Sequence, residues 1–198
     1  MTMEAEYSSV LTGAAFMLFE FKQLTKLKEQ GDSDEDIRRK AIAENLFQYE
    51  KISSLKRGLP SILRRINALD PTLQKMILEE SLESIKIINL YAIMKTDRLF
   101  FEFMNEVICE KIQTNDYILE KKDLNLFFAI KAEQDSGVDS WTESTIQKLK
   151  QVYRKILLET GLLKNKTSGE LNRLIVDEHI KRHLIQIGDR AYVQAMGE

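Results

Sequence analysis

The chain has 198 residues, of which 43% are hydrophobic, and it holds only 8 glycines and 2 prolines. This composition is typical of a packed, helix-rich globule and argues against disorder. With 29 basic and 31 acidic residues the formal net charge is −2, so the whole molecule is not a general binder of polyanions.

The longest uncharged stretch, residues 7–19, is shorter than the roughly 20 residues that cross a bilayer. Glu4 and Glu6 stand where a secretion signal would carry positive charge. A single cysteine, Cys109, forms no internal disulfide and lies among apolar neighbours typical of a core position. We therefore expect a cytoplasmic protein that does not contact a membrane.

The first third of the chain predicts three helices. One is expected over about residues 8–29, and a second, with Ser33 as its cap and acids in its first turn, over 33–47. A third is expected over 53–69, where Pro60 either kinks the helix or marks its beginning.

The rest of the chain continues the helical pattern. Residues 72–111 predict one or two long core helices divided near the sequence KTDR. A helix over 121–134, a turn at DSGVDS and an amphipathic helix over about 141–160 follow. We expect an all-α protein.

Two of these helices carry positive charge on one face. Residues 51–66 contain five basic side chains and no acid, and residues 144–166 contain six against Glu159 alone. A helical projection turns their apolar stripes inward and the basic side chains outward. A solvated surface helix usually interleaves Glu with Lys, so charge of one sign favours an anionic partner.

Each basic helix follows a short helix, which is the order of a helix-turn-helix unit. Ordinary helix packing produces the same order, so this alternative stays open. After the second unit, ETGLLKNKTSGELNRLIV is expected as a short β-wing, with Gly161 leaving the helix and KNKTSG at its tip. The expected regions are an N-terminal helix-turn-helix-like region (1–71), central core helices (72–120) and a C-terminal winged-helix-like region (121–198).

The outward positions of both units are candidate contacts to DNA. Arg and Lys there would bind phosphates without reading sequence, and Gln151 is the strongest candidate for a contact to a base. We therefore expect weak sequence preference and strong salt dependence. The candidates are Ser53, Lys56, Arg57, Arg64, Arg65, Thr142, Ser144, Thr145, Lys148, Gln151, Arg154, Lys155, Lys164 and Lys166.

Catalytic and metal-binding patterns are not found in the sequence. His179 and His183 have the i, i+4 spacing of a metal pair, but neither a third histidine nor HExxH accompanies them. No Walker loop, GxGxxG turn or GxSxG elbow occurs. We expect a non-enzymatic protein with no metal or cofactor.

Four stretches carry a family resemblance: YSSVLTGAAFMLFEFKQLTKLKEQGDSDEDIRRKAIAENLF, SSLKRGLPSILRRINAL, KTDRLFFEF and WTESTIQKLKQVYRKILLETGLL. Over nearly the whole chain they resemble the BrxA family of bacteriophage-exclusion (BREX) systems. The resemblance implies a DNA-binding component of phage defence that works beside a methyltransferase and ATPase-type proteins. Two alternatives remain: an assembly adaptor whose basic faces meet acidic partner proteins, and RNA binding in the manner of NusB, to which the family is likened.

Overall fold

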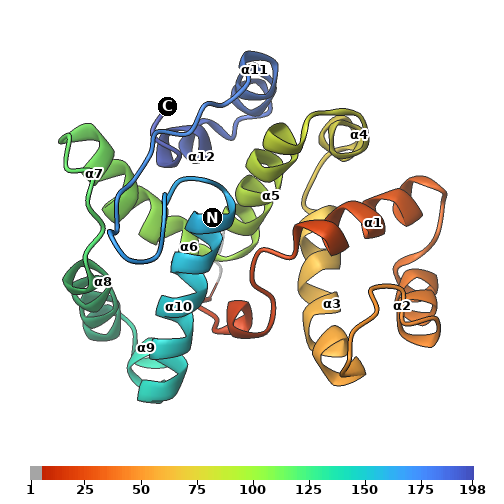
Figure 1. The fold of residues 1–198 in the computed structure, drawn as a ribbon, viewed down its shortest axis with the longest axis horizontal. Coiled ribbons are helices and arrows are strands. Elements are labelled where there is room, and N and C mark those ends of the chain that lie inside the picture. The colour runs from red at the N-terminus through yellow and green to blue at the C-terminus, as the bar shows by residue number, and fades with distance from the viewer. Residues whose placement is uncertain (1–5) are drawn as a thin grey trace.

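The computed structural model describes residues 6–198 and, within that range, contains helices and no β-strand (Figure 1). The all-α expectation is confirmed. In chain order the elements are the 3₁₀-helix η1 (Val10–Gly13), α1 (Leu18–Glu29), α2 (Asp34–Ala43), α3 (Ile52–Asn67), α4 (Pro71–Glu79), α5 (Leu82–Thr96), α6 (Arg98–Phe103), the π-helix η2 (Met104–Cys109), α7 (Glu110–Gln113), α8 (Lys121–Gln134), α9 (Ser136–Asp139), α10 (Glu143–Glu159), α11 (Glu178–Gln186) and α12 (Arg190–Ala195).

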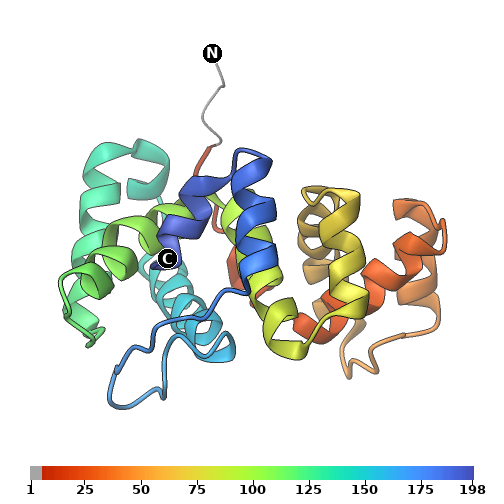
Figure 2. The same cartoon turned by 90° about the horizontal axis from the view of Figure 1, so that it is seen from above.

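The helices form two groups joined by a central pair. In Figure 1, α1 to α4 lie on one side and α7 to α10 on the other, with α5 and α6 between them. Helices α11 and α12 cover α5, as Figure 2 shows from above. The segment that contains η1 runs between α3 and α10 and packs against both. The basic helices are therefore held by one shared scaffold.

The expectation of one helix over 8–29 is wrong. After η1 the chain is not helical over 14–17, Met17 has a φ of 48°, and α1 begins only at Leu18. This break allows Leu11, Ala14 and Phe16 to be buried together. Backbone carbonyls in this segment are not used in helical hydrogen bonds, so they can accept hydrogen bonds from other donors.

Helices α2 and α3 lie where the sequence predicted helices, but their ends differ from the prediction. Ser33 caps α2 as predicted and accepts a hydrogen bond from the N–H of Asp36 at 3.1 Å. The helix ends at Ala43 rather than 47, because Asn45 adopts a φ of 44° and its side chain bonds the backbone of Tyr49. Helix α3 begins at Ile52, so Pro60 lies inside it and does not mark its start.

The region 72–111 contains three helical runs rather than one or two. Asp70 caps α4, and Ser81 caps α5. The predicted division near KTDR is confirmed, because Asp97 ends α5 and caps α6 through the N–H of Phe100 at 2.9 Å. Helices α6, η2 and α7 then form one continuous run over residues 98–113.

The C-terminal part keeps its helices but not its wing. The prediction for α8 is confirmed, and Gly161, with a φ of 80°, ends α10 as expected. Residues 162–171 form a loop closed by one antiparallel bridge between Leu163 and Leu171. No strand forms in the part of the chain that the structure describes, so the hairpin of a β-wing is not present there.

One hydrophobic core connects the three expected regions. The ring of Tyr153 in α10 packs edge-to-face against Phe100 and at a tilt against Phe103 of α6, with ring centroids 5.0 and 5.1 Å apart, and against Phe128 of α8 at 5.6 Å. The same cluster continues through Ile62 and its neighbours in α3. Such aromatic packing holds α10 firmly by its inner face.

Candidate nucleic-acid interface

Helix α3 presents a buried stripe and a basic outer face. Leu55, Leu59, Ile62 and Ile66 are buried, as the projection predicted. Gly58 lets the N-terminal segment come close, because a Cβ there would meet the side chain of Met17. The helix is therefore fixed along its inner side, and its outer side is free.

The exposed cations of α3 have no carboxylate partner. Lys56, Arg57 and Arg64 are exposed, and none has an ion pair among residues 6–198. Within residues 6–198 the guanidinium of Arg57 forms a single hydrogen bond, to the hydroxyl of Ser54 at 3.4 Å. Lys51 at the N-cap is a further exposed cation of this kind, which the candidate set omitted although it begins the acid-free run.

Arg65 is a correction to the candidate set. Its side chain is only 1% exposed, and its guanidinium donates hydrogen bonds to the backbone carbonyls of Phe16, at 3.1 Å, and Ala14. Burial lowers the pKa of Arg65 to about 10. Arg65 cannot contact DNA, because its guanidinium is held inside the protein as the donor to the carbonyls freed by the break at 14–17.

Helix α10 begins with a cluster of hydroxyl groups. Thr142 caps the helix by accepting a hydrogen bond from the N–H of Thr145 at 3.2 Å. Its hydroxyl also lies 2.9 Å from those of Ser144 and Thr145. Thr142 and Ser144 are exposed, and Thr145 is half-buried. These side chains build the start of the helix and leave hydroxyls at the surface.

The outer face of α10 forms a basic hollow with the loop that follows it. The hollow measures about 340 Å³, and Val152 forms its floor. Arg154 donates a hydrogen bond to the carbonyl of Lys166 at 2.8 Å, which ties this loop to the helix. The lining comprises Lys148, Gln151, Val152, Arg154, Lys155 and Lys166. The structure thus brings five of the predicted residues together.

Two of the predicted cations already have partners. Lys164 forms an ion pair with Glu170 across the loop, and Lys155 lies 3.5 Å from Glu159 one turn on. Both pairs are solvent-exposed, so each contributes little and can exchange for a phosphate. Lys148 and Lys166 have no ion pair within the described range.

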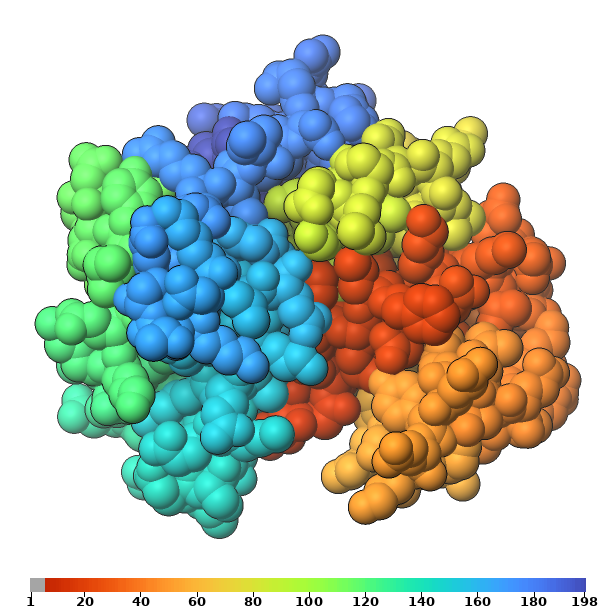
Figure 3. Space-filling view, in the orientation of Figure 1, coloured from red at the N-terminus to blue at the C-terminus, as the bar shows by residue number. Residues whose placement is uncertain are grey.

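The two basic helices begin at the same end of the molecule. In Figure 1 the N-terminal ends of α3 and α10 both lie at the lower edge, and Figure 3 shows a notch between them. Gly13 of η1 lies beside Arg57, and Arg64 lines a small recess with Val10 and Leu11. The N-terminal segment therefore spaces the two basic faces.

The connections differ from a tight helix-turn-helix. Residues 44–51 join α2 to α3, and residues 135–142, including α9, join α8 to α10. Both are longer than the roughly 3–4-residue turn of that motif. The order of the helices is that of a helix-turn-helix motif, but the connections between the paired helices are longer.

The two histidines bind carboxylates. His183 lies 2.8 Å from Asp70, and His179 lies 3.0 Å from Glu80, so both join α11 to the two ends of α4. Within residues 6–198 no group of three or more His, Cys, Asp or Glu side chains is placed to hold a metal ion. No helix in the same range has the length and apolar character needed to cross a bilayer.

Comparisons with known proteins place the chain in a family. The BrxA family model matches residues 5–188. A BREX protein BrxA from Bacillus cereus is 40% identical over 197 residues, which covers 99% of this chain and 98% of that protein. A BREX protein BrxA from Paramagnetospirillum magneticum is 19% identical over 193 residues, covering 98% of this chain and 97% of that protein.

A solved structure supports the fold. The crystal structure of an uncharacterized protein from Magnetospirillum magneticum is similar with a TM-score of 0.84 and 20% identity, over 97% of this chain and 98% of that chain. At this identity the likeness concerns the fold alone. On the family model and the Bacillus cereus relative, the chain belongs to the BrxA family of BREX phage-defence systems.

Proposed function

We propose that this protein is a non-enzymatic DNA-binding component of its BREX system. It binds duplex DNA through the outer faces of α3 and α10 and through the loop at 164–169. Its contacts are mainly to phosphates, so its preference for sequence is weak.

The unpaired cations of α3 carry this proposal. Elsewhere in the described range, exposed cations are mixed: Lys75 and Arg182 lie near a carboxylate one turn away, at 3.7 and 3.1 Å, whereas Lys121 and Arg190 form no ion pair. The cations of α3 differ because several of them stand together on one helix. Lys56, Arg57 and Arg64 share a helix without a single acid. Cations without internal partners keep a concentrated positive potential, which favours a polyanion.

The position of α10 supports the same surface. Its hollow adds Lys148 and Lys166, and the exposed amide of Gln151 in the same lining is able to contact a base edge. Helices α3 and α10 begin at the same end of the molecule, on either side of the notch of Figure 3. One polyanion can contact both faces there.

A fluorescence-anisotropy titration against a labelled duplex of about 30 base pairs tests the proposal, with salt concentration as the variable. Each phosphate that a cation engages adds about −0.9 to the slope of log affinity against log salt. A double variant, Lys56→Glu with Lys148→Glu, should weaken binding at least about 10-fold and make the slope shallower by about 2.

The matched control reverses two exposed cations away from this surface, Lys75→Glu and Arg182→Glu. It changes net charge by the same amount, and we expect it to retain most of the affinity. Equal losses in both double variants would mean that only overall charge matters, and the assigned surface would be wrong.

An RNA competitor of equal length separates duplex DNA from the alternative ligand. Preferential displacement by structured RNA would replace DNA with RNA as the ligand of this surface. Failure to bind either nucleic acid at low salt would reject the proposal and favour the adaptor alternative, in which the basic faces meet acidic proteins.

A further inference from the structure

A second surface lies on the other side of α8 from its contact with Tyr153. A groove of about 430 Å³ runs between α8 and the run formed by η2 and α7. Its walls differ in chemistry. Leu126 and Ile130 line it from α8, while Glu106 and Glu110 line it from η2 and α7, and Val107 and Phe127 lie between them.

The α8 wall exposes apolar surface. Leu126 is 63% exposed and Ile130 is 39% exposed, although both are large aliphatic side chains. They are one helical turn apart, so both project from the same face of α8. The neighbouring Phe127 and Phe128 are buried, so α8 contributes these two side chains to the core and leaves Leu126 and Ile130 outside it. Paired aliphatic side chains in a groove are typical of an interaction site.

The opposite wall is acidic. Glu106 bonds the buried Lys131 at 2.7 Å but remains partly exposed, and Glu110 is exposed with no ion pair within residues 6–198. The π-helical turns of η2 change the spacing of side chains here, and such turns recur at functional sites.

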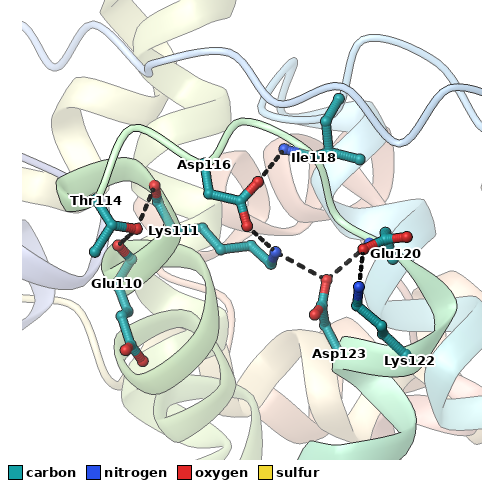
Figure 4. Close-up of polar contacts among 8 residues, drawn as sticks. All are labelled: Glu110, Lys111, Thr114, Asp116, Ile118, Glu120, Lys122 and Asp123. Carbon is teal, nitrogen blue, oxygen red and sulfur yellow. Dashed lines mark hydrogen bonds and ion pairs between the residues drawn. The ribbon is translucent and has the colours of Figure 1, made fainter.

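A network of ion pairs, drawn in Figure 4, joins three residues of the groove lining, Lys111, Asp116 and Asp123. The ammonium of Lys111 lies 2.7 Å from Asp116 and 3.0 Å from Asp123. Asp123 in turn accepts a hydrogen bond from the N–H of Glu120 at 2.8 Å. The one cation in the lining is thus neutralised internally, and the groove retains an excess of carboxylates.

We infer that this groove binds an amphipathic helical segment of a partner protein, with aliphatic side chains on one face and Lys or Arg at its flanks. Aliphatic anchors would cover Leu126 and Ile130, and the flanking cations would pair with Glu106 and Glu110. This is the helix-in-groove mode of recognition, with charge complementarity setting the orientation.

The groove does not depend on the proposed DNA binding. None of its lining residues belongs to α3, α10 or the loop at 164–169. Its carboxylates repel phosphates, so nucleic acid is excluded as its occupant. DNA and the partner segment can therefore bind at the same time, and the protein would connect the two.

A synthetic peptide of about 15 residues, long enough to form a helix on binding, serves as the probe. It carries leucines on one face and lysines at the flanks of that face, and a scrambled peptide of the same composition is its control. Fluorescence anisotropy measures affinity. We expect the amphipathic peptide to bind at least about 5-fold more tightly than the scrambled one.

Leu126→Glu gives opposite predictions for docking and for simple charge attraction. The change makes the groove more acidic, so nonspecific attraction of a basic peptide would increase. If the aliphatic face docks, affinity should instead fall by about 10-fold, because the anchor contact is lost. Leu126 is exposed, so the variant should fold normally. Ile175→Glu, at an 86% exposed position outside the groove, is the matched control and should leave affinity unchanged within about 2-fold.

Glu110→Gln tests the acidic wall. It should lower the affinity for the peptide by about 3-fold and make that affinity less dependent on salt concentration. None of these variants should alter DNA binding, which separates this inference from the proposed function. Unchanged or tighter peptide binding by Leu126→Glu would overturn the inference. Concentration-dependent dimerisation of the parent that Leu126→Glu abolishes would also overturn it, because the occupant would be a second copy of the chain.

Discussion

Arg65 reaches from α3 to the backbone carbonyl of Phe16, 49 residues earlier in the chain, with an N···O distance of 3.1 Å. The side chain of Asn89 in α5 donates to the same carbonyl at 2.7 Å. A buried guanidinium and a buried amide thus fix the non-helical segment between η1 and α1. The adjacent Arg64 is exposed, so two consecutive arginines have opposite surroundings.

Replacing these arginines one at a time should separate stability from binding. Arg65→Ala removes the side-chain donor of the Ala14 carbonyl and leaves the Phe16 carbonyl with Asn89 alone, so it should reduce the free energy of unfolding by about 3 kcal/mol. Arg64→Ala should change it by less than about 0.5 kcal/mol while weakening DNA binding. Urea denaturation and anisotropy measure the two effects. Equal stability of the two variants would show that the buried contacts of Arg65 are dispensable.

Lys131 is a second cation whose role is structural. It is 4% exposed and lies 2.5 Å from Glu102 and 2.7 Å from Glu106. Lys131→Met leaves these carboxylates without their buried partner, so we expect a loss of about 3 kcal/mol by chemical denaturation. Lys75→Met breaks an exposed pair with Glu79 and should cost under about 0.5 kcal/mol. A small loss in Lys131→Met would indicate that water reaches the carboxylates.

Asp97 should make stability depend on pH. Burial raises its pKa to about 6, although the hydrogen bond from Phe100 and the charges of Arg65 and Arg64 oppose the rise. Because the pKa in the fold lies above the unfolded value of about 3.9, the stabilisation is fully present below that value and is lost as pH rises through about 6.

Asp97→Asn keeps an acceptor for Phe100 and removes the titration. Between pH 4 and 7 the stability of the parent relative to this variant should fall by roughly 2–3 kcal/mol. Guanidinium denaturation of both proteins across this range is the measurement. Parallel pH profiles would show that Asp97 is not the responsible group.

Gly169 should be essential to the loop that carries Lys166. Its φ is 69°, and a Cβ there would overlap the carbonyl oxygen of Leu119. Gly169→Ala should cost about 3 kcal/mol and weaken DNA binding by displacing the loop. Gly161→Ala, with a φ of 80° and open space around it, should cost only about 1 kcal/mol. Thermal melts and anisotropy compare them, and equal costs would remove the steric explanation.

Features that depend on near neighbours in the chain could be predicted from the sequence. Helix periodicity, the cap at Ser33 and the division at Asp97 follow from hydrogen bonds between residues three or four apart. The bounds of α8 and the buried and outer faces of α10 were predictable for the same reason.

Which basic side chains are free for a ligand depends on tertiary contacts. A helical projection placed Arg64 on the outer face of α3 and Arg65 at its flank, so both were candidate contacts. The burial of Arg65 was not foreseeable, because the donors needed by the carbonyl of Phe16 cannot be recognised until the break at 14–17 is known. The groove beside Leu126 depends likewise on how η2 and α7 pack against α8. Such arrangements come from contacts between residues distant in the chain, which the pattern of any one segment does not contain.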